Sequence, residues 1–210
     1  MKIELSNKDA FLKNVLKYLG YPTDIFPDNN ITEKIWQATD EVEKNSTFQS
    51  TYAHFDTLLD FLKEESAYRE YLSHATEYLL CAYTLGAQID RKIKRLQITD
   101  MTYSLVFDAV ASAYLECSAD EFEKALPYNE LGFRFCPGYG GTSIHDNQKI
   151  ASLLHAERIG ISFLESGLMI PLKSMIGIIR VGGTATKTCR NCVVASDCPF
   201  RAKGTFCYAR

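Results

Sequence analysis

The sequence has no long hydrophobic run and no strongly basic stretch. None of its apolar segments approaches the roughly 18 consecutive apolar residues that a membrane-spanning helix needs. The first residues, MKIELSNKDAFLK, lack the apolar core of a secretory signal peptide. The net charge of −3, without a basic face, argues against nucleic acid as a partner. We therefore expect a cytoplasmic protein that binds neither membranes nor nucleic acid.

The overall composition is that of an ordinary globular protein. Of the 210 residues, 46% are hydrophobic and 23% are charged. This length is sufficient for one domain with a real buried core, or for one domain with an appendage. The chain does not need disulfides or metals to fold at this size.

The sequence contains seven cysteines, and they are unevenly distributed along the chain. An odd number of cysteines in a cytoplasmic protein indicates thiols or metal ligands rather than disulfides. Four of them crowd the segment 189–210, at Cys189, Cys192, Cys198 and Cys207. Four thiolates this close could surround one zinc ion or one iron–sulfur cluster. The alternative is four free thiols on a surface tail.

The order of predicted elements favours an α+β fold. Apolar periodicity and capping residues predict helices at 6–19, 28–44, 75–96 and 100–126, and β-branched and aromatic residues predict a strand at 46–56. Shorter elements follow: strands at 132–137, 159–166, 167–171 and 174–183, and a helix at 144–159. We expect N-terminal helices packed around a small, mostly antiparallel, twisted sheet. The predicted division is a domain at 1–182 and a cysteine-rich C-terminal tail at 183–210.

The segment RFCPGYGG, 134–141, has residues that suit a small charged ligand. The glycines at 138, 140 and 141 permit positive φ and close approach of the backbone. Arg134 offers a planar fork for a carboxylate or phosphate, and Tyr139 offers a flat face for a base or a sulfonium. The alternative interpretation is a plain strand-to-helix turn with a surface arginine and a half-buried tyrosine.

The pattern Arg134-x-x-x-Gly138-Tyr139 resembles the S-adenosylmethionine-binding motif of the activation (reactivation) domain of cobalamin-dependent methionine synthase. Three other segments resemble that family in the same order: YTLGAQIDRKI, like the family's TLG helix, then FDAVASAYLE and ERIGISFLESGLMIPLKSMIGI. The resemblance covers roughly residues 75 to 182. This chain would be a stand-alone form of the domain.

The resemblance implies an accessory protein that binds S-adenosylmethionine and supports reductive methylation of cobalamin on a separate corrinoid methyltransferase. The partner would be a corrinoid protein or a methionine synthase that lacks its own activation domain. An electron donor such as flavodoxin would supply the reducing electron. The alternative is a non-catalytic module on the same fold, which binds a corrinoid protein or a metal as a chaperone or sensor.

The resemblance also implies roles for particular residues. Arg134 would bind the methionine carboxylate, and Tyr139 would line the methyl or adenosine site. The predicted backbone contacts to the adenine come from Phe135, Cys136, Pro137 and Gly138.

Two further residues match positions that the family uses, and one position departs from it. Glu116 would balance the positive charge of the ligand, or else be a solvated helix carboxylate. His145 would meet the displaced cobalt ligand of the corrinoid domain, or else be a solvent-exposed histidine at a helix start. Tyr128 stands where methionine synthase has an acidic residue, six positions before the motif arginine.

Overall fold

The computed structural model shows two compact units that are interleaved along the chain. The described residues are 8–22, 25, 27–73, 75, 77–182, 196, 198–202 and 204. The helical unit contains described residues within 8–49, 83–125 and 170–174, and the sheet unit those within 50–82, 126–169 and 175–204. The chain therefore passes between the units five times, at 49/50, 82/83, 125/126, 169/170 and 174/175.

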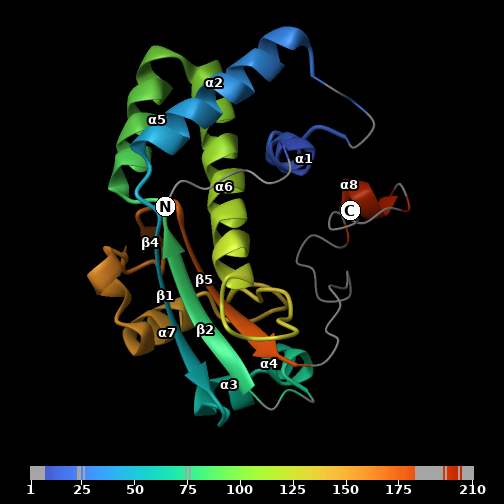
Figure 1. Ribbon diagram of the computed structural model, residues 1–210, viewed down its shortest axis with the longest axis vertical. Coiled ribbons are helices and arrows are strands. Elements are labelled where there is room, and N and C mark those ends of the chain that lie inside the picture. The colour runs from blue at the N-terminus through green and yellow to red at the C-terminus, as the bar shows by residue number, and fades with distance from the viewer. Residues whose placement is uncertain are drawn as a thin grey trace. The chain divides into compact units, whose positions relative to one another are not determined.

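Within the described residues, the helical unit contains the four helices α1 (Lys8–Tyr18), α2 (Asn29–Asn45), α5 (Ala87–Thr99) and α6 (Met101–Lys124) (Figure 1). The long helix α6 packs against each of the other three. Ala109, Ala111, Ala113 and Ala119 are all buried on it. Small side chains on several faces let neighbouring helices approach from more than one direction, which explains why α6 has no single apolar stripe.

Aspartates cap the two longest helices. The backbone N–H of Ile31 donates to Asp28 Oδ1 at 2.8 Å, and that of Tyr103 donates to Asp100 Oδ1 at 2.9 Å. Each bond satisfies one of the N–H groups that a helix start leaves unpaired. The predicted helices at 28–44 and from 100 onward are confirmed, as is the helix predicted at 6–19.

One carboxylate joins three helices of this unit. Glu41 on α2 lies 2.6 Å from Lys92 Nζ on α5 and accepts a 3.0 Å hydrogen bond from the Tyr103 hydroxyl on α6. Burial opposes ionisation, but the hydrogen bonds and the charge of Lys92 outweigh it, so the pKa of Glu41 lies below its ordinary value. Glu41 therefore stays ionised and ties α2, α5 and α6 together.

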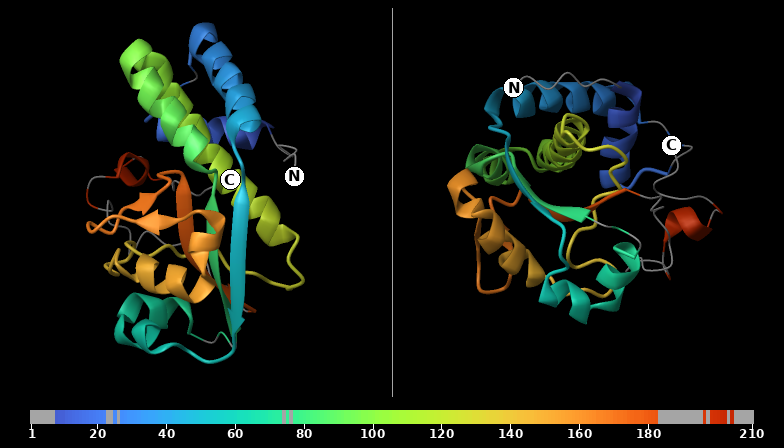
Figure 2. Two further views of the ribbon diagram at one scale, coloured as in Figure 1. Left: turned by 90° about the vertical axis from the view of Figure 1, so that its left-hand side faces the viewer. Right: turned by 60° about the horizontal axis from the view of Figure 1, so that its bottom comes forward.

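The sheet unit holds most of a three-stranded antiparallel sheet, in the order β1-β2-β5. Its strands are β1 (Gln49–Phe55), β2 (Glu77–Thr84) and β5 (Ser174–Val181). Short elements complete the unit: α3 (Asp60–Glu64), α4 (Ser66–Tyr71), α7 (Asp146–Leu154), η1 (Ala156–Ile159), β3 (Ser162–Phe163) and β4 (Met169–Ile170). The α3–α4 pair and α7 flank the strands in Figure 2.

The core of the sheet unit lies on one face of these strands. Tyr78, Leu80 and Ala82 alternate along β2, and Ile176 and Ile178 alternate along β5, so all five point to the same face. The helices contribute Tyr68, Tyr71, Ile150, Ala151 and Leu154 to the same cluster. Phe135, from the segment before α7, also belongs to it. The unit thus has a rich aromatic core.

The prediction of one helix at 75–96 is wrong in its first half. Residues 77–84 form β2, and the helix α5 begins only at Ala87. Every residue of β2 after Glu77 is buried, so the strand reads as a continuous apolar run instead of an alternating one. Periodicity alone cannot separate such a run from a buried helix. The TLG segment is therefore not helical: Thr84 ends β2, and Gly86 precedes α5 with φ of 82°.

The α+β fold class is confirmed, with the predicted small antiparallel sheet. The strand predicted at 46–56 is β1, the helix predicted at 144–159 is α7 followed by η1, and the three late strands are β3, β4 and β5. The helices α3 and α4 were not predicted. In the part of the chain that the structure describes, no helix has both the length and the apolarity to cross a bilayer. Most of the predicted tail, 183–210, lies outside the described residues.

Candidate functional site

The segment before the glycine-rich loop lies along the free edge of β5. Antiparallel bridges join Leu131 to Val181 and Phe135 to Ile178. Between these two bridges the chain advances by four residues in the segment, from 131 to 135, but by three residues in β5, from 178 to 181. The segment therefore contains one extra residue, as a β-bulge does. The strand predicted at 132–137 is therefore present only as these two bridges. Both backbone groups of Phe135 bond to Ile178, at 2.9 and 2.8 Å.

Arg134 lies across β5 at a glycine. A Cβ added to Gly177 would lie 2.9 Å from Arg134 Cδ and closer still to its Cγ, so only glycine leaves room for the arginine stem. Phe133 and Phe135 pack in or against the aromatic core, whereas Arg134 is directed to the Gly177 side of the strand. Gly177 thus leaves room for the aliphatic part of Arg134 on this side of the sheet.

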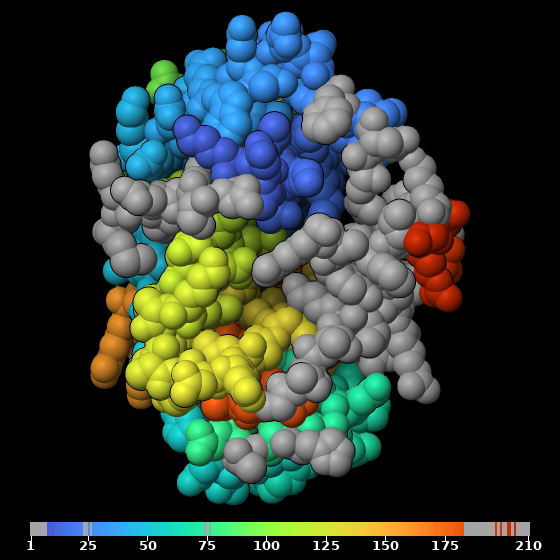
Figure 3. Space-filling view, turned by 45° about the vertical axis from the view of Figure 1, so that its right-hand side comes forward, coloured from blue at the N-terminus to red at the C-terminus, as the bar shows by residue number. Residues whose placement is uncertain are grey.

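The loop that follows has the backbone conformation expected from its glycines. Gly138, Gly140 and Gly141 have φ values of 97°, 63° and 81°, which side-chain-bearing residues rarely adopt. Pro137 before them is buried, whereas Tyr139 between them is 57% exposed. The segment that joins α6 to α7 reaches the molecular surface, where part of it is yellow in Figure 3. More than half of the surface of Tyr139 is therefore in contact with solvent.

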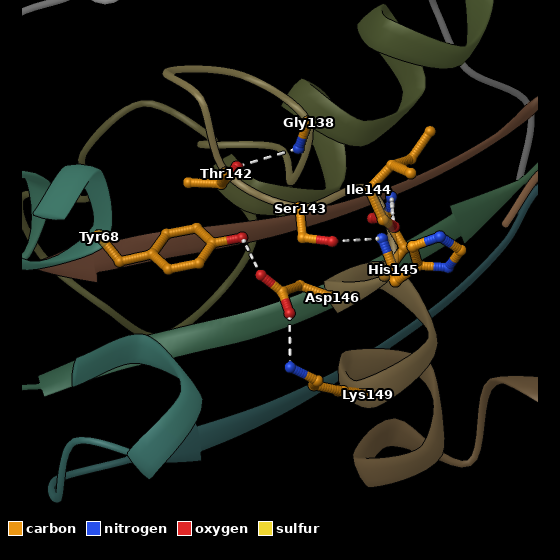
Figure 4. A network of polar contacts seen from close by, with 9 residues as sticks. Tyr68, Gly138, Thr142, Ser143, Ile144, His145, Asp146 and Lys149 are labelled. Carbon is orange, nitrogen blue, oxygen red and sulfur yellow. Dashed lines mark hydrogen bonds and ion pairs between the residues drawn. The ribbon is translucent and has the colours of Figure 1, made fainter. Parts of the chain in front are cut away.

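A buried polar network holds the end of this loop (Figure 4). The Thr142 hydroxyl accepts a 3.0 Å hydrogen bond from Gly138 N–H and donates a 2.8 Å bond to the Tyr139 carbonyl. The Tyr68 hydroxyl on α4 donates to Asp146 Oδ2 at 3.1 Å, and Lys149 Nζ lies 2.8 Å from Asp146 Oδ1. The side chains of Tyr68, Thr142 and Asp146 are buried, whereas Tyr139 and the Lys149 ammonium are exposed.

The electrostatics of this network keep the Tyr68 hydroxyl protonated. Burial raises the pKa of Tyr68 above its ordinary value, a hydrogen bond with Thr142 acts against this, and the nearby Asp146 charge raises it further. The Asp146 carboxylate also raises the pKa of Lys149 by hydrogen bonding to its ammonium group. Tyr68 is thus a fixed hydrogen-bond donor to a carboxylate that Lys149 neutralises.

His145 is exposed at the residue before α7. Its backbone N–H donates to Ser143 Oγ at 3.2 Å. Its ring lies beside the turn between β3 and β4, because a Cβ at Gly167 would lie 3.2 Å from His145 Nδ1. The same turn contains Glu165 and Ser166, which belong to a segment of the family resemblance. The structure thus places the β3–β4 turn next to His145.

Glu116 lies in the other unit, on α6. Its carboxylate accepts a 2.6 Å hydrogen bond from the Tyr18 hydroxyl of α1. Its placement beside a ligand remains a prediction.

The position that departs from the family is occupied by an aromatic cluster. The Tyr128 ring stacks on His54, with centroids 5.6 Å apart, and meets Tyr52 edge-on at 6.5 Å. His54 Nε2 in turn lies 3.0 Å from Glu77 Oε2. A carboxylate is therefore near this position, but it comes from β2, 51 residues earlier in the chain than Tyr128.

Two residues that fix the motif segment could not be identified from the sequence as site residues. The Tyr71 hydroxyl donates to the Phe133 carbonyl and accepts a 3.1 Å bond from Arg180 N–H. The buried Arg180 side chain bonds to the carbonyls of Gly182 and Tyr71 and lies over Gly132. The feature of the sequence that could have drawn attention to Arg180 is its position as a charged residue within the apolar run of β5.

The predicted metal site falls almost entirely outside the described residues. Of its four cysteines only Cys198 is described, and Cys189, Cys192 and Cys207 are not. The described portion contains no group of three or more histidine, cysteine, aspartate or glutamate residues arranged to hold a metal, which leaves the cysteine set untested.

Cys117 lies on α6, away from the predicted metal site in the sequence. Burial together with nearby acids raises the pKa of its thiol to about 11, so it is a poor ligand and nucleophile.

No protein-family model and no curated protein matches this sequence. Among solved structures, the chain is similar to a crystal structure of the MetH reactivation domain bound to AdoHcy, with a TM-score of 0.61 and 14% sequence identity. The match covers 93% of this chain and 83% of that chain. At this identity the similarity establishes the fold, which is that of the MetH reactivation domain.

Proposed function

We propose that this chain binds S-adenosylmethionine at residues 134–139 and supports reductive methylation of cobalamin on a separate corrinoid methyltransferase, such as methionine synthase. One observation carries the proposal: Arg134 is fixed across β5 at Gly177 and leads directly into a turn of glycines with positive φ. A planar guanidinium group on this segment suits a carboxylate, and the glycines of the turn allow a ligand to approach the backbone closely. The bound AdoHcy of the structural neighbour supports the proposal, because AdoHcy is S-adenosylmethionine without its methyl group.

The proposed contacts are those that the family resemblance implies. Arg134 binds the methionine carboxylate in bidentate fashion. Tyr139 covers the adenosine or methyl group with its exposed ring. We assign the backbone contacts to adenine to the segment 135–138, which the pairing of Phe135 with Ile178 holds on the sheet edge. We assign Glu116 to charge balance for the sulfonium, and exposed His145 to the corrinoid partner.

The chemical step takes place on the partner. One electron from a donor such as flavodoxin reduces the partner's cobalt. The cobalt then attacks the methyl carbon of the sulfonium, so that a cobalt–carbon bond forms and the carbon–sulfur bond breaks. The sulfur keeps the electron pair, and AdoHcy leaves. This chain contributes binding and orientation of the methyl donor, which converts the transfer into a step between pre-aligned groups.

A second candidate is a non-catalytic module that binds a corrinoid protein or a metal. The Tyr128 cluster favours it, because stacking on His54 replaces the acid that the family has at that position. The cysteine tail also fits it: Cys189, Cys192, Cys198 and Cys207 would hold zinc for docking, or an iron–sulfur cluster. Elemental analysis of anaerobically purified protein tests the tail, and a preparation with neither zinc nor iron would eliminate both metals.

The decisive experiment is calorimetric titration of S-adenosylmethionine into the wild type, Arg134→Ala and Arg134→Lys. Loss of a charge-assisted hydrogen bond should weaken binding by about 10- to 150-fold in the alanine variant. Arg134→Lys should recover only part of this, because an ammonium lacks the planar fork. Arg91→Ala, on the exposed side of α5, is the matched control and should bind like the wild type. No heat from the wild type at millimolar ligand would refute the proposal.

A further inference from the structure

Thr142 is a buried anchor between two exposed stretches of the loop. Tyr139 and Gly141 are exposed before it, and Ser143 and His145 are exposed after it, whereas Thr142 is only 6% exposed. Its hydroxyl bonds to Gly138 N–H and to the Tyr139 carbonyl, so one side chain closes the glycine turn on itself. The backbone of the turn also bonds to itself: the Thr142 N–H donates to the Tyr139 carbonyl at 3.1 Å, and the Tyr139 N–H donates to the Cys136 carbonyl at 3.3 Å. The Thr142 hydroxyl adds two side-chain bonds to these, which further restrict the conformation of the turn.

Tyr68 connects this anchor to the start of α7. Its hydroxyl donates to Asp146 Oδ2, and the Thr142 side chain lies near the same hydroxyl in Figure 4. In Figure 4 the Tyr68 hydroxyl and the Lys149 ammonium point at the two oxygens of the Asp146 carboxylate. Thr142 and Asp146 bracket the exposed residues 143–145. One buried tyrosine thus contacts both ends of the stretch that carries His145.

Packing alone does not explain these polar groups. Tyr68 is 0% exposed, and its ring lies 5.5 Å from Phe135 and 6.4 Å from Phe61, in an aromatic environment that phenylalanine would fill. A buried carboxylate such as Asp146 costs stability unless it is paired and hydrogen-bonded, which Lys149 and Tyr68 accomplish. Fully satisfied buried networks of this kind select one conformation of the groups they hold.

We infer that Tyr68, Thr142 and Asp146 are positioning residues that hold residues 138–145 in the ligand-binding conformation before the ligand arrives. The inference rests on the proposed function of the loop as an S-adenosylmethionine site. None of the three needs to touch the ligand. Their effect is on preorganisation: a loop that is already ordered loses less entropy on binding.

The first test is amide hydrogen exchange in the ligand-free protein, comparing Tyr68→Phe with Tyr78→Phe. Tyr78 is the matched control, because it is a buried tyrosine of the same core whose hydroxyl bonds to Leu59 N–H and the Thr57 carbonyl instead. In Tyr68→Phe, the amides of Gly138 and Thr142 should exchange about tenfold faster, the factor for loss of one hydrogen bond to a charged group. Equal exchange at these amides in both variants would overturn the inference.

The second test compares affinity for S-adenosylmethionine with stability in urea for Thr142→Val and Thr142→Ser. Valine keeps the shape but loses the hydroxyl, and should weaken binding by about tenfold; serine keeps the hydroxyl and should restore most of the affinity. A purely structural role would lower the urea midpoint without changing the affinity of the folded protein, and that result would also overturn the inference. This pair decides the question even if Tyr68→Phe does not fold.

The two proposals fail in different ways. If the wild type binds no S-adenosylmethionine, the proposed function is wrong, and the exchange measurement alone decides whether the three residues position the loop. If the wild type binds and Arg134→Ala does not, but Thr142→Val binds like the wild type, the proposed function stands and the positioning role is refuted.

Discussion

Tyrosine hydroxyls make different hydrogen bonds in the two units. In the helical unit, Tyr18 donates to Glu116 and Tyr103 donates to Glu41, so hydroxyls join neighbouring helices through carboxylates. In the sheet unit, Tyr68 also donates to a carboxylate, that of Asp146, but Tyr71 donates to the Phe133 carbonyl and Tyr78 donates to the Thr57 carbonyl. Regular helices satisfy their own backbone, whereas the segments around the sheet need side chains to do it. The tyrosine hydroxyls of the sheet unit should therefore contribute more to the backbone conformation around them than those of the helical unit do.

The largest effect that tests this comparison is expected for Tyr71→Phe. It leaves the Phe133 carbonyl and the Arg180 N–H without their hydroxyl partner, which should lower the free energy of unfolding by about 2–3 kcal/mol. Urea denaturation followed by circular dichroism measures it. A loss below that of the helical-unit variant Tyr18→Phe would contradict the comparison.

Gly177→Ala should come next, with a cost of about 1–2 kcal/mol from overpacking. The added Cβ would collide with Arg134, so the arginine must move and affinity for S-adenosylmethionine should fall as well. A double-mutant cycle with Arg134→Ala isolates the cause. If Gly177→Ala destabilises the protein equally in the Arg134→Ala background, the arginine stem is not what requires a glycine.

Tyr18→Phe should cost less, about 0.5–1 kcal/mol, because both Tyr18 and Glu116 can bond to water instead. Trp36 is the one tryptophan of the chain and lies on α2, so its fluorescence follows unfolding of the helical unit. A urea midpoint, followed by this fluorescence, that does not move in Tyr18→Phe would contradict the prediction.

The smallest effect is expected for Glu41→Gln, and it should depend on pH. Because the folded-state pKa of Glu41 is lowered, its contribution is fully present above its ordinary pKa and disappears as pH falls through the folded value. The difference from wild type should be about 0.2–0.5 kcal/mol at neutral pH, in the range of partly exposed ion pairs. Urea titrations at neutral and acidic pH measure this difference in the free energy of unfolding. A difference between wild type and Glu41→Gln that grows as the pH falls would contradict the prediction.

Sequence patterns predicted the features that depend on neighbours in the chain. The helix starts at Asp28 and at Thr99 or Asp100 were identifiable, and so was the positive φ of the glycines at 138, 140 and 141, because each of these signals acts within a few residues. The helix predicted at 75–96 failed because β2 is buried on both faces and lacks the alternation of a half-exposed strand. Tyr68 was missed because its partner, Asp146, is 78 residues away and leaves no local signal.

The interleaving of the two units has a consequence for biosynthesis. The helices α1 and α2 leave the ribosome before α6, the helix they pack against, which begins only at Met101. The strand β5, which carries Gly177 and pairs with β2, comes later still. Neither unit can therefore be completed by an early fragment of the nascent chain, and such long-range contacts slow folding. Partly synthesised chains should expose the apolar sides of α1 and α2, so this protein should depend on holding chaperones more than its modest length suggests.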